Sequence, residues 1–191
     1  ELFETFKKSW STWRGERIRL PETDEEKLTK RQKGNIPALP IFVYSRKGRK
    51  RMRALLRHSI DHARTNISLT TAYFTPSKKI IALLENAVRR GVKVRLLVPG
   101  KSDVPAASYA GRAFFTRLLK SGVEIYTYRG EMLHAKTYVF DNDWSIIGST
   151  NLDYQSLMYN DEGNIGILET SFASKMIEMF EEDLEHSIRI D

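Results

Sequence analysis

The sequence has no cysteine among its 191 residues, so disulfide bonds and thiolate metal sites are excluded. Long hydrophobic runs are missing as well. The longest apolar segments, such as residues 94–99, are short and contain Arg95, so no stretch of this sequence predicts a membrane span. Internal repeats and low-complexity tracts are also absent. A disulfide scaffold and a repeat architecture are therefore not expected.

The residues that are present have the composition of a globular domain. Hydrophobic residues make up 41% of the chain and charged residues 29%, and the length allows one domain with a real core. The net charge of +7 and the pI of about 9.6 suit an anionic partner such as phosphate, nucleic acid or an acidic lipid surface. Charge alone is equally compatible with simple solubility.

Residues 1–36 differ in character from the rest. Residues 1–20 suggest a short amphipathic helix, and residues 21–35 are charged, poor in apolar side chains and typical of a linker. The first residue is Glu1 rather than Met, so we expect a processed chain or a fragment. We therefore expect a helix and charged linker over 1–36 and one folded domain over 37–191.

From residue 36 onward, strand-like and helix-like segments alternate. Strands are predicted at 39–45, 66–74, 92–98, 123–129 and 163–169, and helices at 46–64, 77–90, the second part of 102–122, and 171–188 after a Ser171 cap. This alternation predicts an α/β layered domain with parallel strand pairing. A hairpin at 136–149, turning through Asn142 and Asp143, adds antiparallel pairing. The expected fold is a mixed β-sheet flanked by helices.

Residues 134–151 read HAKTYVFDNDWSIIGSTN and hold the strongest functional signal. On a strand, the side chains of His134 and Lys136 would share one face. Lysine is rarely buried without a partner, so such a face needs an anion, and phosphate fits best. Gly148, Ser149 and Asn151 follow the hairpin and supply further donors. The segment therefore predicts the floor of a phosphate pocket.

Chemistry at phosphorus needs a nucleophile and groups that stabilise charge. His134 can be the nucleophile if its other ring nitrogen is held by an acceptor, for which Glu162 is a candidate. Lys136 and Asn151 would neutralise the phosphoryl oxygens. No cluster of carboxylates or histidines has the spacing of metal ligands, so we expect neither a metal nor another cofactor.

The pattern H-x-K-x4-D-x6-G-S-x-N resembles the signature of the phospholipase D superfamily, and residues 134–151 match every defined position. The resemblance implies a phospholipase D-like fold. It implies structural roles for Asp141 and Gly148, and for Ser149 either phosphate binding or capping of the turn. Glu162 matches the family's histidine-orienting glutamate. Residues Tyr73, Phe74 and Thr75 look like the family's pocket-lining segment, although an aromatic pair that ends a strand is as often part of the core.

Residues 37–188 resemble the C-terminal half of bacterial cardiolipin synthases, in which one chain carries two such motifs and the two histidines meet at one active site. This sequence has one such motif. The other histidines, His58, His62 and His186, are not followed by a lysine two positions later. Residues 2–10 resemble the segment that closes the first half. The resemblance implies that the partner of this domain is the N-terminal half of the same protein or a second copy of the chain.

The resemblance implies a phosphatidyltransferase that makes cardiolipin from phosphatidylglycerol through a phosphohistidine intermediate. It implies association with the bacterial cell membrane, although we expect this chain by itself to be soluble and inactive. Two alternatives remain: a nuclease or phosphodiesterase of the same superfamily, and a non-catalytic module that binds anions or membranes. Nucleic acid is the less favoured partner, because the basic run 46–57 contains no aromatic residue on which bases could stack. The expected pocket walls are instead apolar: Tyr73, Phe74, Pro76, Val104, Pro105, Leu157 and Met158.

Overall fold

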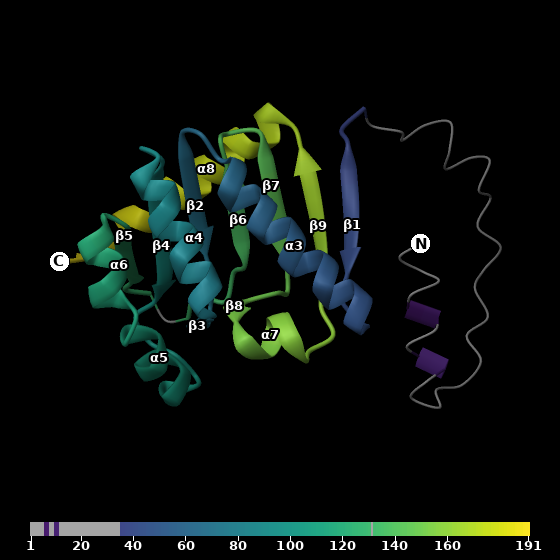
Figure 1. Ribbon diagram of the computed structural model, residues 1–191, viewed down its shortest axis with the longest axis horizontal. Coiled ribbons are helices and arrows are strands. Elements are labelled where there is room, and N and C mark those ends of the chain that lie inside the picture. The colour runs from purple at the N-terminus through teal and green to yellow at the C-terminus, as the bar shows by residue number, and fades with distance from the viewer. Residues whose placement is uncertain (1–5, 8–9, 12–34, 131) are drawn as a thin grey trace. The chain divides into compact units, whose positions relative to one another are not determined.

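Figure 1 shows the protein as a computed structural model, which describes residues 6–7, 10–11, 35–130 and 132–191. Two compact units are separated in the sequence, Glu1–Ile36 and Pro37–Asp191. Residues 6–7 and 10–11 are helical, and the rest of the helix and linker expected in the first unit lies outside the described residues. Within the described part of the chain, no helix has the length and apolar character needed to cross a membrane.

Within the described residues, the second unit is built on an eight-stranded mixed sheet. Its strand order is β1-β9-β7-β6-β2-β4-β5-β10. Strands β2, β4 and β5 run parallel to one another and the remaining neighbours pair antiparallel. The strands are β1 (Ala38–Phe42), β2 (Asn66–Thr70), β4 (Lys93–Pro99), β5 (Glu124–Tyr128), β6 (Thr137–Phe140), β7 (Trp144–Gly148), β9 (Gly163–Leu168) and β10 (Ser187–Ile190). The predicted mixed sheet is confirmed.

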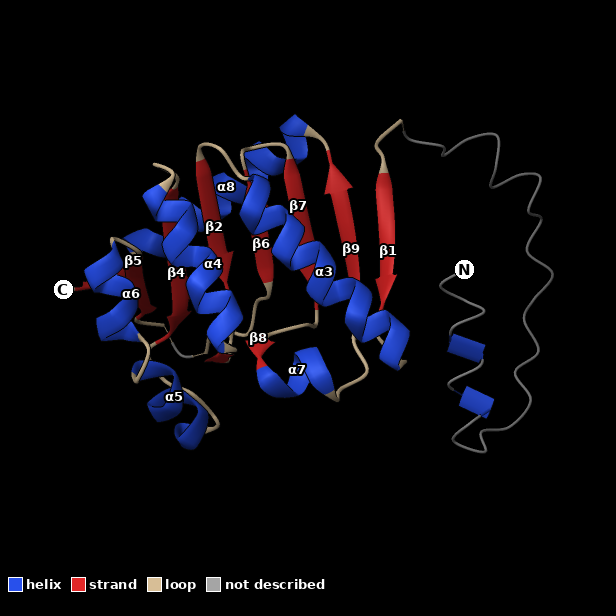
Figure 2. Ribbon diagram, viewed as in Figure 1, coloured by secondary structure: helices blue, strands red, loops and turns tan. Residues whose placement is uncertain are grey.

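Helices cover both faces of this sheet. Figure 2 shows α3 (Arg46–His62), α4 (Lys78–Arg89) and α6 (Phe115–Ser121) on the near face and α8 (Thr170–Glu185) on the far face. Two further short helices, α5 (Pro105–Arg112) and α7 (Tyr154–Met158), lie beyond one edge formed by strand ends. Near them β3 (Phe74–Thr75) pairs in parallel with β8 (Leu152–Asp153). The layered α/β architecture expected from the sequence is confirmed.

Local sequence explains where the long helices begin. Ser45 and Ser77 precede α3 and α4, and each side chain accepts a hydrogen bond from a backbone N–H in the first turn. Before α8, however, Glu169 caps the helix, with its carboxylate 2.5 Å from the Phe172 nitrogen. The predicted Ser171 cap is therefore wrong. Ser171 instead donates to Glu169 from within the first turn.

The core lies between the sheet and its helices. On α3 the buried apolar residues Met52, Leu56 and Ile60 recur every four positions, which places them on one face of the helix. They pack in one cluster with side chains from α4 and from the central strands. This packing fixes the ends of the strands, from which the candidate site is built.

The single strand expected at 66–74 is wrong. β2 ends at Thr70, and the chain leaves the sheet before β3 begins at Phe74. Hydrogen bonds to Asn151 explain this break in the strand. The Asn151 side-chain oxygen accepts one from the Thr71 hydroxyl at 3.3 Å and one from the Tyr73 backbone nitrogen at 3.2 Å. Three short elements were also not expected, namely β8, α7 and β10, and residues 102–122 hold two helices instead of one.

Candidate active site

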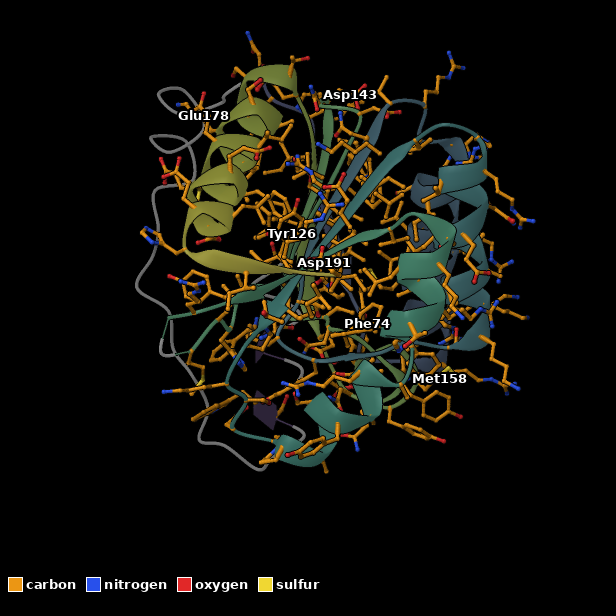
Figure 3. All side chains as sticks on the ribbon, turned by 90° about the vertical axis from the view of Figure 1, so that its left-hand side faces the viewer. Phe74, Tyr126, Asp143, Met158, Glu178 and Asp191 are labelled. Carbon is orange, nitrogen blue, oxygen red and sulfur yellow. The ribbon has the colours of Figure 1, made fainter. Side chains whose placement is uncertain are left out.

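The candidate functional side chains gather at one edge of the sheet, where strands end, because of its topology. Lys136 comes directly before β6, Ser149 directly after β7, and Glu162 directly before β9. β6 runs antiparallel to β2 and to β7, so the start of β6 lies beside the ends of both. Figure 3 shows the labelled Phe74 and Met158 toward this edge and Asp143, in the hairpin turn, at the opposite one.

His134 and Lys136 lie in a non-strand segment just before β6, so their expected position within a strand is wrong. The His134 side chain is exposed, whereas Lys136 is only 7% exposed. The Lys136 ammonium donates a hydrogen bond to the His134 carbonyl oxygen at 2.7 Å. Burial lowers the pKa of Lys136, while the carboxylates of Glu162, Asp103 and Asp153 act in the opposite direction. Two further N–H groups of the ammonium remain for an anion.

Tyr73 holds the imidazole from the side. Its ring meets the His134 ring edge-on, with centroids 5.9 Å apart and an interplanar angle of 82°. The Tyr73 hydroxyl donates to the two carboxylate oxygens of Asp103 at 2.8 and 2.9 Å, and this hydrogen bond raises the pKa of Tyr73. A residue expected in the pocket wall is thus in contact with the candidate nucleophile.

The other two residues of the expected wall segment are placed differently. Phe74 is only 5% exposed and its ring lies 6.4 Å from that of Phe115, so it belongs to the core. Thr75 is partly buried in β3. Leu157 is likewise a core residue, whereas Met158 and Val104 are exposed.

Asn151 is 6% exposed and is oriented by its neighbours. Its side-chain oxygen is engaged by Thr71 and Tyr73, as described above for the end of β2. Within the described residues, no hydrogen bond engages the Asn151 side-chain nitrogen. An amide held in this way presents its N–H groups to a ligand oxygen without first losing a protein contact.

Ser149 and Glu162 form a pair of their own. The Ser149 hydroxyl donates to Glu162, and the Gly163 backbone N–H donates to the same hydroxyl at 3.0 Å. Among the described residues, no hydrogen bond or ion pair joins Glu162 to His134, so the contact predicted between them is not made in this structure. Glu162 is still close enough to the site for its charge to raise the pKa of Lys136.

Asp141 lies at the other end of the hairpin, away from the site. Its carboxylate accepts hydrogen bonds from the backbone N–H groups of Arg64, Thr65 and Asn66, and from the Thr65 hydroxyl. Burial acts to raise the pKa of Asp141, but these hydrogen bonds outweigh it and hold the pKa below its usual value. The carboxylate thus ties the hairpin to the start of β2. The left-handed positions of the turn are Asp141 and Asn142, with φ of 51° and 61°.

Gly148 is required by close backbone packing. A Cβ at this position would collide with the Gly163 carbonyl oxygen and lie 2.6 Å from the Asn164 Cα. Only glycine lets β7 approach β9 this closely just before Ser149.

Two carboxylates near the site were not expected from the sequence. Asp153 is 7% exposed, caps α7 by accepting a hydrogen bond from the Ser156 N–H at 2.6 Å, and has a pKa raised by burial. Aspartate is among the preferred N-cap residues, so a cap at this position could have been found. Asp103 has no such signal, because its partner Tyr73 is 30 residues away. Among the described residues, no three His, Asp or Glu side chains gather in a way that could hold a metal ion.

Comparison with known proteins identifies the family of this chain. The family model for the cardiolipin synthase, phospholipase D-like domain matches residues 56–184. Cardiolipin synthase 2 of Bacillus anthracis is 39% identical over 131 residues, covering 69% of this chain and 26% of that protein. Cardiolipin synthase A of Cronobacter sakazakii is 35% identical over 133 residues, covering 70% of this chain and 27% of that protein.

A solved structure shows the same fold. Nuc, a phospholipase D family member from Salmonella typhimurium, superimposes with a TM-score of 0.69 at 22% sequence identity, covering 82% of this chain and 99% of that one. The present chain spans about a quarter of the length of the curated relatives it matches. With the family model matched over more than half of its residues, the chain belongs to the family of cardiolipin synthase, phospholipase D-like domains.

Proposed function

We propose that this chain supplies one half of the active site of a cardiolipin synthase-type phosphatidyltransferase. The observation that carries the proposal is the exposed imidazole of His134 beside the buried ammonium of Lys136, which makes no ion pair among the described residues. A buried cation without a bonded carboxylate is costly, and a phosphodiester anion would offset that cost. Relatives with 35–39% identity that carry the name cardiolipin synthase support this substrate class.

The proposed reaction runs in two displacement steps at one phosphorus. A histidine, His134 or its counterpart in the other half, attacks the phosphorus of phosphatidylglycerol. A P–N bond forms, the P–O bond to glycerol breaks, and the second histidine gives the leaving oxygen its proton. The hydroxyl of a second phosphatidylglycerol then loses its proton to that same base, forms a new P–O bond and releases the first histidine. The products are cardiolipin and glycerol.

Within this chain, Lys136 and Asn151 would bind the phosphoryl oxygens, where negative charge grows as the nucleophile attacks. Tyr73 would hold the His134 ring through its edge contact. Ser149 would act through its bond to Glu162, either holding that carboxylate or adding its hydroxyl to the phosphate site. Glu162 would set the local field that keeps Lys136 protonated.

The reaction needs a second histidine, so the partner of this domain would be an N-terminal half of the same protein or a second copy of the chain. The substrates are phospholipids, so the enzyme would work at the bacterial cell membrane. Phosphatidylglycerol is favoured over nucleic acid because residues 46–57, the densest basic run, contain no aromatic side chain for stacking. No cofactor is part of the proposal.

The test compares two substrates with the protein that carries this domain together with its partner half. Labelled phosphatidylglycerol in mixed micelles is separated by thin-layer chromatography, and labelled single- and double-stranded nucleic acids are run on a gel. We expect cardiolipin and glycerol on the plate and intact nucleic acid on the gel. Efficient cleavage of nucleic acid without a lipid product would replace the proposal with a nuclease.

A further inference from the structure

A cavity of about 250 Å³ lies between α3, α4 and α7. None of the catalytic candidates lines it: its walls come from Arg53, Arg57, Ser77, Lys79, Ile80, Leu83, Tyr154, Leu157 and Met158. At about 30 Å³ for each molecule of liquid water, the volume corresponds to roughly eight waters. The cavity is thus about the size of a lipid headgroup with its first methylenes, and smaller than a whole lipid.

The cavity has an apolar floor and a cationic rim. Ile80, Leu83, Leu157 and Met158 supply the apolar surface, and no aspartate or glutamate is among the lining residues. Arg53 and Arg57 are four residues apart on α3, so they lie on the same face of that helix. Lys79 joins them from the first turn of α4.

Among the described residues, these three cations have no acidic partner. The ion pairs of the described residues join Arg49 to Asp161, Arg95 to Glu181 and Arg117 to Glu85, and none includes a cation of the rim. One guanidinium N–H group of Arg53 donates to the Leu157 carbonyl oxygen at 2.5 Å, which places the Arg53 head at the cavity. Three like charges around one hollow repel one another, and an anion placed among them relieves that repulsion.

We propose that this cavity binds the phosphodiester headgroup of one anionic phospholipid, as a second lipid site apart from the catalytic one. Arg53, Arg57 and Lys79 would bind the phosphate oxygens, and the apolar floor would take the glycerol end and the first methylenes. A bare phosphate would leave this floor uncovered, and a zwitterionic lipid would bring its own cation to the cationic rim. The choice of lipid rests on the proposed function, but the cavity and its charges do not.

The site borders the catalytic one through α7. This helix follows Asn151 by a few residues, is capped by Asp153, and is tied to α3 by the hydrogen bond from Arg53. A lipid bound at the cavity would hold the domain at a membrane surface with the catalytic edge of the sheet close to that surface.

The test uses the His134→Ala variant of the 191-residue chain with labelled methionine methyl groups, so that no turnover consumes the lipid. The methyl signals of three methionines report on three different places. Met158 lines the cavity, Met132 is two residues from position 134 in the catalytic site, and Met179 is on α8. Dihexanoyl-phosphatidylglycerol, dihexanoyl-phosphatidylcholine and inorganic phosphate are titrated below the micelle concentration. We expect saturable shifts of the Met158 methyl with phosphatidylglycerol only, and no shift of Met179.

Two double variants with equal charge loss separate the cavity from the general basic surface. Arg57→Gln with Lys79→Gln removes two rim cations, and Lys50→Gln with Arg51→Gln removes two exposed cations of α3 outside the cavity. We expect the first pair to weaken phosphatidylglycerol binding at Met158 about tenfold or more and the second less than about twofold.

Three outcomes would overturn the inference: a Met158 methyl that does not move, equal weakening by both pairs, or inorganic phosphate binding as tightly as the lipid. Because the readout is binding in a variant without His134, a failure of the proposed catalysis would appear in the lipid assay and leave this result unaffected.

Discussion

At Lys136 the domain buries an ammonium group that hydrogen-bonds, among the described residues, to a single carbonyl oxygen. Burial lowers its pKa, and three nearby carboxylates, the first of them Glu162, counteract that shift without bonding to it. These carboxylates therefore favour the charged form of the lysine. Its readiness to bind a phosphoryl group therefore depends on residues that never touch the phosphate.

Glu162→Gln tests that dependence. Because Glu162 raises the pKa of Lys136, its removal lowers that pKa further, and Lys136 loses its proton at a lower pH. We expect a slower reaction and an alkaline limb of the kcat/KM profile that moves to lower pH. Asp161→Asn is the matched control, since it removes the neighbouring carboxylate, which is paired with Arg49. An unchanged profile in Glu162→Gln, or an equal shift in both variants, would refute the role.

The sequence motif and its surroundings predicted five candidate site residues: His134, Lys136, Ser149, Asn151 and Glu162. The structure places all of them at the edge of the sheet where β7 ends and β6 and β9 begin. Their contacts were harder to foresee. The partner of Glu162 is Ser149 and the neighbour of the imidazole is Tyr73. Such pairings depend on how strand ends line up across the sheet, which a linear motif does not encode.

At the scale of the elements, the close pairing of β7 with β9 depends on one glycine, Gly148. Gly148→Ala would push a methyl group into the backbone of residues 163 and 164, so we expect a loss of about 3 kcal/mol, or roughly 6–12 °C in Tm. Gly163→Ala is the control on the partner strand, because a Cβ there meets nothing within 4 Å. Thermal unfolding of both variants decides the matter: equal Tm values would mean that close packing is not the reason for Gly148.

The hairpin turn depends on a charge. The pKa of Asp141 is below its usual value in the folded protein, so the carboxylate adds stability above the ordinary Asp pKa of about 4. That stability is lost as the pH falls through the folded pKa. At pH 7 we expect Asp141→Asn to lower the free energy of unfolding by about 1–3 kcal/mol, with the difference vanishing in acid.

Asp143→Asn is the control for this variant, because within the described residues the exposed Asp143 makes no side-chain hydrogen bond. Urea unfolding at a series of pH values measures both. A stability difference for Asp141→Asn that stays constant down to pH 2 would show that its charge is not what anchors the turn.

Element prediction succeeded where periodicity was long and failed where segments were short. The helical stripe of α3 and the alternating sheet strands were visible in the sequence. β3, β8 and α7 have only two, two and five residues, which is too few for a period to show. The break after Thr70 escaped detection because its cause, the side chain of Asn151, lies 80 residues from Thr71.

For the whole molecule, one motif offers one catalytic histidine. We therefore expect the 191-residue chain alone to make cardiolipin about a hundredfold or more slowly than a protein with both motifs, because the leaving-group acid is missing. Lipid turnover by a chain shown to be monomeric at the assay concentration would contradict this. A rate that rises with the fraction of dimer would show instead that two copies complete each other's site.

The most direct test of the account is the rate of cardiolipin formation by His134→Ala in the protein that carries both halves, measured beside its Tm and circular dichroism. The imidazole is exposed, and among the described residues its one ring contact is with Tyr73, so its loss should leave the fold intact. The account predicts a fall in rate of about ten-thousandfold or more at unchanged Tm. A rate within about tenfold of the unmodified protein, with the fold preserved, would contradict it.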